Sequence, residues 1–281
     1  MTHRVRVLTA TLLIAVPVLF LLFYGLLTMT FDYPGILQEP LGEILRRFAA
    51  GGPPLVLLWY GFALTPALFI PAAILLRRAF PDTTPFLDLA VPLGVLAGLV
   101  QVLGLIRWPF LVPELARIFL DPAASEATQT AALAVFGAFH QYAGVAIGEH
   151  LGYLFTGAWT LVIAAAMLTS PVFRPWLGWA GIVSVLGILV GLLEPAGIAL
   201  AGTVNAVAYL AWSLWLVATG VSLLRTHAQV ADSPVAVDPN PTHVPIAATT
   251  TNTRAPKRPA GVASSWIGPA SKREPDPVRR S

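Results

Sequence analysis

The chain has 281 residues, of which 56% are hydrophobic and only 11% are charged, with a net charge of +3 and a mean hydropathy of +0.74. Soluble domains carry about a quarter charged residues, so this composition excludes an ordinary soluble domain. The apolar runs are continuous rather than alternating, which argues against a transmembrane β-barrel. No cysteine is present, and this excludes disulfides, thiolate metal sites and cysteine nucleophiles.

Six apolar stretches predict six transmembrane helices, because roughly 20 helical residues cross about 30 Å of hydrocarbon. The predicted spans are residues 7–29, 55–76, 86–106, 147–168, 177–193 and 198–224. They predict an all-α integral membrane protein with a six-helix transmembrane bundle. The first span follows Arg4 and Arg6, as in a signal peptide. Its apolar core is too long for one and no small-residue cleavage site follows, so we interpret it as an uncleaved span.

Two connecting segments carry patterns of their own. In Ile36–Ala50, apolar residues recur at helical spacing, which predicts an outer amphipathic helix on the membrane surface or covering the bundle. Trp108 is expected in an interfacial aromatic belt. Pro109 and Pro113 are expected to end the third helix and to favour extended backbone. Residues 121–122, Asp-Pro, predict the start of the next helix, with the aspartate as N-cap.

No proline interrupts residues 123–168, and a continuous helix of that length would measure about 65–70 Å. Residues 123–148 must therefore extend the fourth span, bend onto the surface or form a separate span. Small and polar side chains recur here every four residues, a spacing that lets helices approach closely. They are His140, Gly144, Gly148, Gly152, Thr156 and Thr160. The alternative is that this stripe lines a narrow cavity.

Several polar side chains are predicted to meet in the outer half of the bundle, because an ionised group at membrane depth costs at least about 2.5–3.5 kcal/mol and pairs with others. The candidate residues are Arg107, His140, Glu149, His150, Glu194 and Asn205. Arg107 is the expected cation for Glu149 or Glu194. Nearer the inner end, Asp88 is expected to pair with a neighbouring arginine, and Gln101 to donate a hydrogen bond to another helix.

Three interpretations of this polar cluster remain open. It forms a structural clasp, a solute or proton pathway through Arg107, Glu149 and Glu194, or a metal or haem site at Glu149 and the two histidines. The last is weak, because His140 and His150 would lie about 80° apart and some 15 Å along one helix. We therefore predict no metal and no cofactor.

The remaining chain, residues 226–281, is rich in proline, threonine, alanine and serine and has no apolar periodicity. It predicts a disordered basic tail. Arginines concentrate at the chain ends and in the loops on the N-terminal side, so the positive-inside rule predicts cytoplasmic termini. The expected partner is the lipid bilayer, with anionic lipids as a possible contact of the tail, and no nucleic acid.

Three segments of the sequence resemble an uncharacterised bacterial family. They are Gly104-Leu105-Ile106-Arg107-Trp108-Pro109-Phe110-Leu111-Val112-Pro113, Phe139-His140-Gln141-Tyr142 and Gly148-Glu149-His150-Leu151-Gly152-Tyr153. The resemblance, to domain-of-unknown-function family 4386, would cover residues 7–225. It implies a bacterial inner-membrane protein of about six spans and brings no established activity.

These observations together favour a non-catalytic membrane interaction or stress-sensing protein of the cell membrane. The alternatives are a small-solute or proton-coupled transporter and an intramembrane metal or haem protein. The sequence contains no GxSxG, HExxH or phosphate-loop pattern, so enzymatic activity is not favoured.

Overall fold

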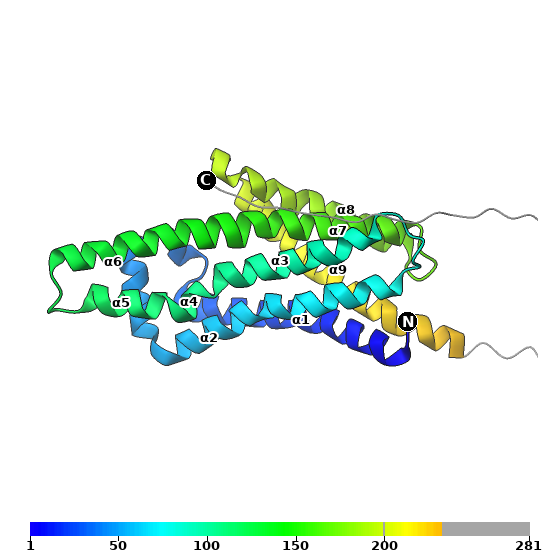
Figure 1. The fold of residues 1–281 in the computed structure, drawn as a ribbon, viewed down its shortest axis with the longest axis horizontal. Helices are drawn as coiled ribbons and strands as arrows, with labels where there is room; N and C mark the ends of the chain where they lie inside the picture. Colours follow the sequence, from blue (N-terminus) through cyan, green and yellow to red (C-terminus); the bar gives the residue numbers. More distant parts are fainter. Residues whose placement is uncertain (199, 232–281) are drawn as a thin grey trace, which may run out of the picture. The chain divides into compact units, whose positions relative to one another are not determined.

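The computed structural model describes residues 1–198 and 200–231, which form helices joined by short turns, with no strand among them (Figure 1). The α-helices are α1 (His3–Phe31), α2 (Leu41–Leu76), α3 (Ala90–Leu105), α4 (Arg107–Phe110), α5 (Val112–Leu120), α6 (Glu126–Phe139), α7 (Gly152–Leu168), α8 (Pro175–Val190) and α9 (Leu200–Ala231). The 3₁₀ segments are η1 (Gly35–Gln38), η2 (Arg77–Ala79), η3 (Leu87–Leu89) and η5 (Gly191–Ala196), and η4 (His140–Leu151) is a π-helix.

Six helical runs within the described residues are long and apolar enough to cross a membrane, which confirms the predicted six-span, all-α fold. The runs are His3–Phe31, Leu41–Ala79, Leu87–Leu120, Glu126–Leu168, Pro175–Ala196 and Leu200–Arg225. They are mostly longer than predicted because polar or amphipathic turns continue the helices beyond their apolar centres. The last helix continues to Ala231, so residues 226–231 are helical, and the rest of the predicted tail lies outside the described residues.

The six runs form a closed ring in chain order. Each run packs against the next, with α7 between α3 and α8, and α9 returns to pack against α1. Successive runs are antiparallel, so the connections alternate between two ends of the bundle. We call the end where the chain begins the N-terminal end and the opposite one the distal end (Figure 1).

The half of the ring at the N-terminal end is filled by aromatic residues from three of the runs. Phe69 lies edge-on to Trp159, with ring centroids 4.8 Å apart, and Trp159 also contacts Trp212 and Trp215. The indole N–H of Trp212 donates to the Thr160 hydroxyl at 2.7 Å. Large aromatic side chains thus fill the centre of the helix bundle, and neighbouring helices accept hydrogen bonds from the indole N–H groups of Trp212 and Trp215.

A second aromatic core fills the distal half, and the α8–α9 hairpin contributes nothing to it. Trp59 and Trp108 stack at 4.2 Å, and Phe31 packs edge-on against both. Trp108 is 1% exposed, so its predicted place in an interfacial aromatic belt is wrong. Its indole is buried because α4 turns it inward onto Trp59 instead of outward to the membrane surface.

The predicted amphipathic helix is present but begins later than expected. Pro40 separates η1 from α2, and the first turns of α2 place Ile44, Leu45 and Phe48 in the distal core. Gly52 then adopts φ 57°, a conformation that favours glycine, and breaks α2 before the second span. This segment therefore covers the distal core rather than lying flat on a membrane.

Two predictions for the third connection are wrong. The backbone continues in helical conformation through Pro109 and Pro113, because each proline lies in the first turn of a short helix, where a missing N–H breaks no bond. Residues 121–122 form a turn instead of a helix start. The N-cap of α6 is Ser125, whose hydroxyl accepts from the backbone N–H of Thr128 at 3.2 Å.

The fourth run, α6–η4–α7, is one uninterrupted helical path that projects beyond the α8–α9 hairpin toward the distal end (Figure 1). Of the predicted alternatives for its first half, the structure shows an extension of the span. The expected irregularity is present as the π-helix η4, which contains Gly144 and Gly148 and ends next to Gly152. The extension packs against α5 and is thereby held in a helical hairpin.

Candidate functional site

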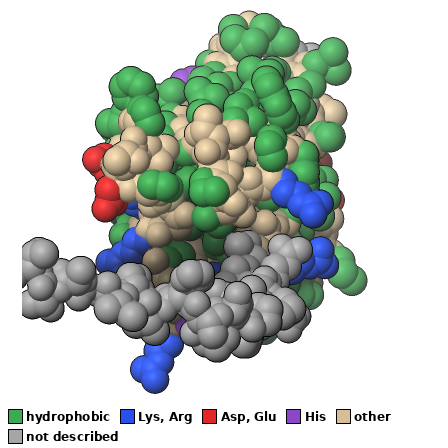
Figure 2. All heavy atoms as spheres, turned by 90° about the vertical axis from the view of Figure 1, so that its right-hand side faces the viewer, with side chains coloured by type: hydrophobic (Ala, Val, Ile, Leu, Met, Phe, Trp, Pro, Cys, Tyr) green, Lys and Arg blue, Asp and Glu red, His purple; other side chains and the backbone are tan. Residues whose placement is uncertain are grey.

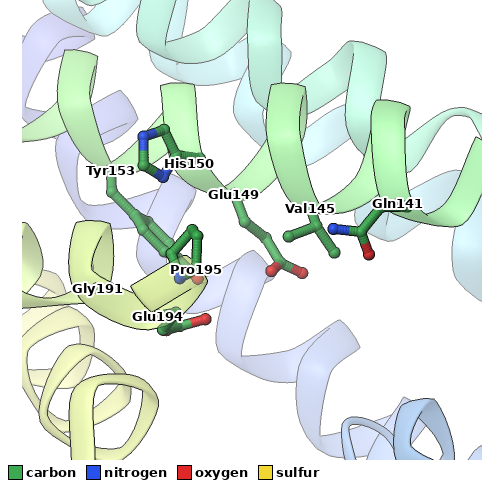
Figure 3. A pocket seen from close by; sticks show the side chains of 8 residues that line it. All are labelled: Gln141, Val145, Glu149, His150, Tyr153, Gly191, Glu194 and Pro195. Atoms are coloured by element: carbon green, nitrogen blue, oxygen red, sulfur yellow. The ribbon is translucent and has the colours of Figure 1, made fainter. Parts of the chain in front are cut away.

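A cavity of about 240 Å³ lies where the α8–α9 turn meets η4 (Figure 3). Its lining comes from two segments with irregular helical geometry, η4 with the start of α7, and η5. The lining residues are Gln141, Val145, Glu149, His150, Tyr153, Gly191, Glu194 and Pro195. We call this cavity the acidic pocket, because two carboxylates line it and no lysine or arginine does.

Residues spaced by four positions supply most of the η4 wall. Gln141, Val145 and Glu149 point from the helix to one side, toward the turn that carries Glu194 (Figure 3). Tyr153, one further step along, completes the row. This row follows the small-residue stripe by one position, so one face of the helix packs on its neighbour while the adjacent face borders the cavity.

The opposite wall of the pocket is formed by η5, which follows directly after α8 ends at Val190. Pro195 has no backbone N–H to continue an α-helical ladder, and Gly197 adopts φ 79° to reverse the chain. The resulting 3₁₀ segment places Glu194 across from the η4 row. Gly191 also lines the pocket, and a Cβ at this position would collide with the Asn205 amide.

Neither carboxylate of the acidic pocket has an ion-pair partner within 4.0 Å among the described residues. The ion pairs that do form lie near the bundle ends, such as Arg77 with Asp88 at 3.0 Å, which confirms the pairing expected for Asp88. Glu149 and Glu194 therefore face a shared space from two different helices without a bound protein cation.

Arg107, the cation expected to pair with Glu149 or Glu194, forms no ion pair with either within 4.0 Å. Its side chain is 7% exposed, donates to the Gly104 carbonyl, and lies over the Trp108 ring with Cζ 5.3 Å from the centroid. The Nε atom has no hydrogen-bond partner, and the guanidinium packs against Gly144. Arg107 thus packs on the distal aromatic core, whereas Glu149 lines the acidic pocket.

The remaining predicted polar residues divide between the two sides. His150 lines the acidic pocket, whereas His140 packs 5.9 Å from the Phe136 ring and its Nδ1 is buried without a partner. Asn205 borders the pocket behind Gly191 and donates to the Ile188 carbonyl at 2.7 Å. The structure thus places Glu149, His150 and Glu194 on one pocket with Asn205 beside them, and neither Arg107 nor His140 lines that pocket.

The middle of the small-residue stripe, from Gly148 to Thr156, faces α3. Gly148 lies against Gly104, where a Cβ on either glycine would meet the other's Cα, and Gly152 lies against Gln101. Gln101 donates to the Thr156 hydroxyl at 3.2 Å, which confirms its predicted interhelical hydrogen bond. Close approach of two helices, rather than the lining of a cavity, is the observed geometry of these positions.

The described residues contain no group of three or more histidine, aspartate or glutamate side chains positioned to hold a metal ion. Of the two histidines, only His150 lines the acidic pocket with Glu149, whereas the metal or haem hypothesis requires both at one site.

Sequence reasoning did not include five residues of the pocket wall in the candidate site, namely Gln141, Val145, Tyr153, Gly191 and Pro195. The four-residue spacing from Gln141 to Tyr153 is a signal that could have identified the row. It is hidden because its members alternate between polar, apolar and aromatic types, whereas the neighbouring stripe is uniformly small.

The comparison with family models gives one match, to a domain of unknown function, DUF4386, over residues 8–220. The match spans more than half of the chain and includes most of each of the six membrane-length runs. The chain belongs to this family. No curated protein and no solved structure matches it. Both walls of the acidic pocket and the whole distal core fall within the part of the chain that matches DUF4386.

Proposed function

We propose that this DUF4386 protein is a non-catalytic, multi-pass protein of the bacterial cell membrane that binds a small cationic solute in the acidic pocket. The observation that carries the proposal is the pair of carboxylates, Glu149 and Glu194, that face one cavity without a protein cation. Buried or half-buried carboxylates in a membrane protein are costly unless a positive charge compensates them. A protonated amine would supply that charge and donate hydrogen bonds to both.

The size of the cavity restricts the ligand class. A volume of about 240 Å³ falls below the roughly 300–1,000 Å³ of sites for drug-sized molecules, so the solute is a small one. Gln141 and His150 add hydrogen-bonding groups, and Val145 and Tyr153 add apolar contact area. This combination fits a short alkylamine, with its ammonium group between the carboxylates and its carbon chain against the valine and tyrosine.

The binding test uses the full-length protein in detergent and compares two ligands of equal shape, 1-propylamine and 1-propanol, by calorimetry. We expect saturable binding of the amine and none of the alcohol. Glu149→Gln and Glu194→Gln should each weaken amine binding at least tenfold, equivalent to about 1.4 kcal/mol. Glu39→Gln, an exposed glutamate outside the pocket, is the matched control and should bind as the wild type does. Equal binding of amine and alcohol would contradict the proposal.

A carrier is the second candidate function. Both walls of the pocket consist of interrupted helix, the π-helix η4 and the 3₁₀ segment η5. Discontinuous helices at a binding site are typical of secondary transporters, and π-segments concentrate at functional sites. The test is amine-dependent flux in proteoliposomes, with Glu194→Gln as the inactive variant. Binding without flux across a panel of short amines would favour a sensor over a carrier.

For the orientation we propose that the N-terminal end of the bundle faces the cytoplasm. The arginines at this end are Arg4, Arg6, Arg77, Arg78, Arg174 and Arg225. Basic side chains surround this face in the view of Figure 2. At the distal end Arg46, Arg47 and Arg117 pair with acidic neighbours, so the net positive charge lies at the N-terminal end. A phosphatase reporter fused after Arg225 should be inactive, and one inserted between α5 and α6 should be active.

A further inference from the structure

Both carboxylates of the acidic pocket lie at one depth, about one hydrocarbon thickness from the loop that joins α7 to α8. Glu194 lies 19 residues after the start of α8 at Pro175, and Glu149 lies 19 residues before the end of α7 at Leu168. At 1.5 Å per helical residue, each distance is about 28 Å. The hydrocarbon core of a bilayer is about 30 Å thick, so the two carboxylates lie at its far boundary if the loop lies at its near one.

The α7–α8 loop has the features of a near boundary. Arg174 lies in it, and Trp176 and Trp179, in the first turns of α8, are 55% and 61% exposed. Exposed tryptophans beside an arginine are typical of the interface between hydrocarbon and water. Between this loop and the two carboxylates, neither helix contains a lysine, arginine, aspartate or glutamate. The acidic pocket therefore lies at the opposite boundary, at the depth of the lipid headgroups.

The turn that carries Glu194 is apolar on its outer surface. Leu193, Ile198 and Leu200 are exposed there, and Leu200 reaches 71%. Exposed aliphatic side chains grouped on one turn are unfavourable in water, whereas at a membrane boundary they contact the acyl chains of lipids. The long helix α6–η4–α7 continues past this turn (Figure 1), so the pocket lies in the angle between the projecting helix and the membrane surface.

This position favours a ligand that belongs to the membrane. Glu149 and Glu194 are only half-buried, so a group outside the protein can reach them. Lipid headgroups are confined to the layer in which the pocket lies, and such confinement raises their effective concentration far above that of a free amine in dilute solution. A headgroup that ends in an ammonium group would therefore occupy the pocket in preference to a free amine.

We propose that the ammonium group bound in the acidic pocket is that of phosphatidylethanolamine from the leaflet at the distal end, an inference that rests on the proposed function. The aminoethyl arm of this headgroup is a short alkylamine, the class of ligand that the cavity of about 240 Å³ accepts. The glycerol and the acyl chains stay outside the cavity, along the exposed apolar side chains of the α8–α9 turn, such as Leu193 and Leu200.

The lining of the pocket selects a primary ammonium group over the quaternary one of phosphatidylcholine. A primary ammonium has three N–H donors, and Glu149 and Glu194 can accept from two sides. A quaternary ammonium has no N–H and binds in cages of several aromatic rings. The lining supplies one phenol ring, that of Tyr153, and one imidazole, that of His150. Choline headgroups are therefore the matched comparison, with the same charge and no hydrogen to donate.

The test measures binding of 1-propylamine by calorimetry to the full-length protein in nanodiscs of two compositions. One contains phosphatidylcholine and the other phosphatidylethanolamine, each with the same share of phosphatidylglycerol so that the surface charge is equal. Ethanolamine headgroups in the pocket would compete with the amine, so we expect propylamine to bind at least tenfold more weakly in the ethanolamine discs. Equal affinity in both discs would overturn this inference and leave the proposed function standing. No binding in either disc would overturn the proposed function, and this inference with it.

Unfolding temperatures in the same two discs, without propylamine, assign the effect to the carboxylates. A lipid bound to the folded state stabilises it, so the wild type should unfold on the order of 3 °C higher in the ethanolamine discs. Glu149→Gln and Glu194→Gln should each lose this difference, which is measured within each variant so that baseline stability does not enter. Glu39→Gln, an exposed glutamate outside the pocket, is the matched control and should retain it. A difference that persists in both pocket variants would be a property of the bilayer and would contradict the proposal. If one variant does not fold, the other decides alone.

Discussion

The contact between Gly104 of α3 and Gly148 of η4 gives the sharpest stability prediction. In a Gly104→Ala variant the added Cβ would lie 2.5 Å from the Cα of Gly148 and 3.0 Å from the carbonyl oxygen of Ala143. Both neighbours are backbone atoms, so no side-chain rotation can relieve the contact. The two helices must move apart along the crossing that Gln101 and Thr156 also stabilise.

The magnitude follows from three contributions. Ordinary carbon contacts lie at about 3.5–4.0 Å, so the helices must separate by about 1 Å, and overpacking of this kind costs about 1–3 kcal/mol. Weakening the Gln101–Thr156 hydrogen bond adds about 0.5–1.5 kcal/mol. Alanine is better than glycine in a helix by about 0.8–1.0 kcal/mol, which offsets part of this. We expect a net loss of about 2 kcal/mol, or about 4–8 °C in unfolding temperature.

Thermal unfolding in detergent, followed by tryptophan fluorescence, measures this loss. Gly25→Ala is the matched control, because Gly25 lies inside α1 and a Cβ there would meet nothing within 4 Å. This control should unfold at the wild-type temperature or slightly above it. If Gly104→Ala unfolds within 1 °C of Gly25→Ala, the close approach of α3 and η4 does not limit stability and the reasoning fails.

Three further predictions test other parts of the structure. Thr160→Val removes the acceptor of the Trp212 indole, and should cost about 1 kcal/mol in unfolding measurements, with no added loss when combined with Trp212→Phe. Ser125→Ala removes the N-cap of α6, and should cost about 1 kcal/mol and increase hydrogen exchange of the Thr128 amide more than that of the α7 amides. Burial raises the pKa of Tyr33 above its ordinary value, so the folded state holds this proton longer than the unfolded state does. Stability should consequently fall as the pH rises above about 10, and Tyr33→Phe should reduce that fall in alkaline unfolding curves.

The spans were predictable because a lipid-exposed segment must be a continuous apolar helix, and long apolar segments are visible in the hydropathy of the sequence. The close-packing stripe was also readable, since Gly144, Gly148 and Gly152 repeat at a fixed spacing. The helix boundaries between α3 and α6 were not. Whether Pro109 ends a helix or begins the next depends on whether Trp108 turns inward, and this is decided by the aromatic rings that it meets.

The candidate site was predictable only in part. Glu149, His150 and Glu194 could be placed at one depth from the order of the spans. The side to which each points could not, because the π-helical turns of η4 shift the register relative to an α-helix. The sequence pattern also made Arg107 the natural partner of Glu149. In the structure the guanidinium instead lies over the buried Trp108 ring and forms no ion pair within 4.0 Å with Glu149.

The distal core has a consequence for the synthesis of the protein. All of its buried members come from residues 27–136, so this half of the molecule can assemble before the last two spans leave the ribosome. The hairpin of α8 and α9 then docks onto a partly finished scaffold and completes the acidic pocket as its final step. A nascent chain halted after α7 would therefore possess one finished core and half of a binding site.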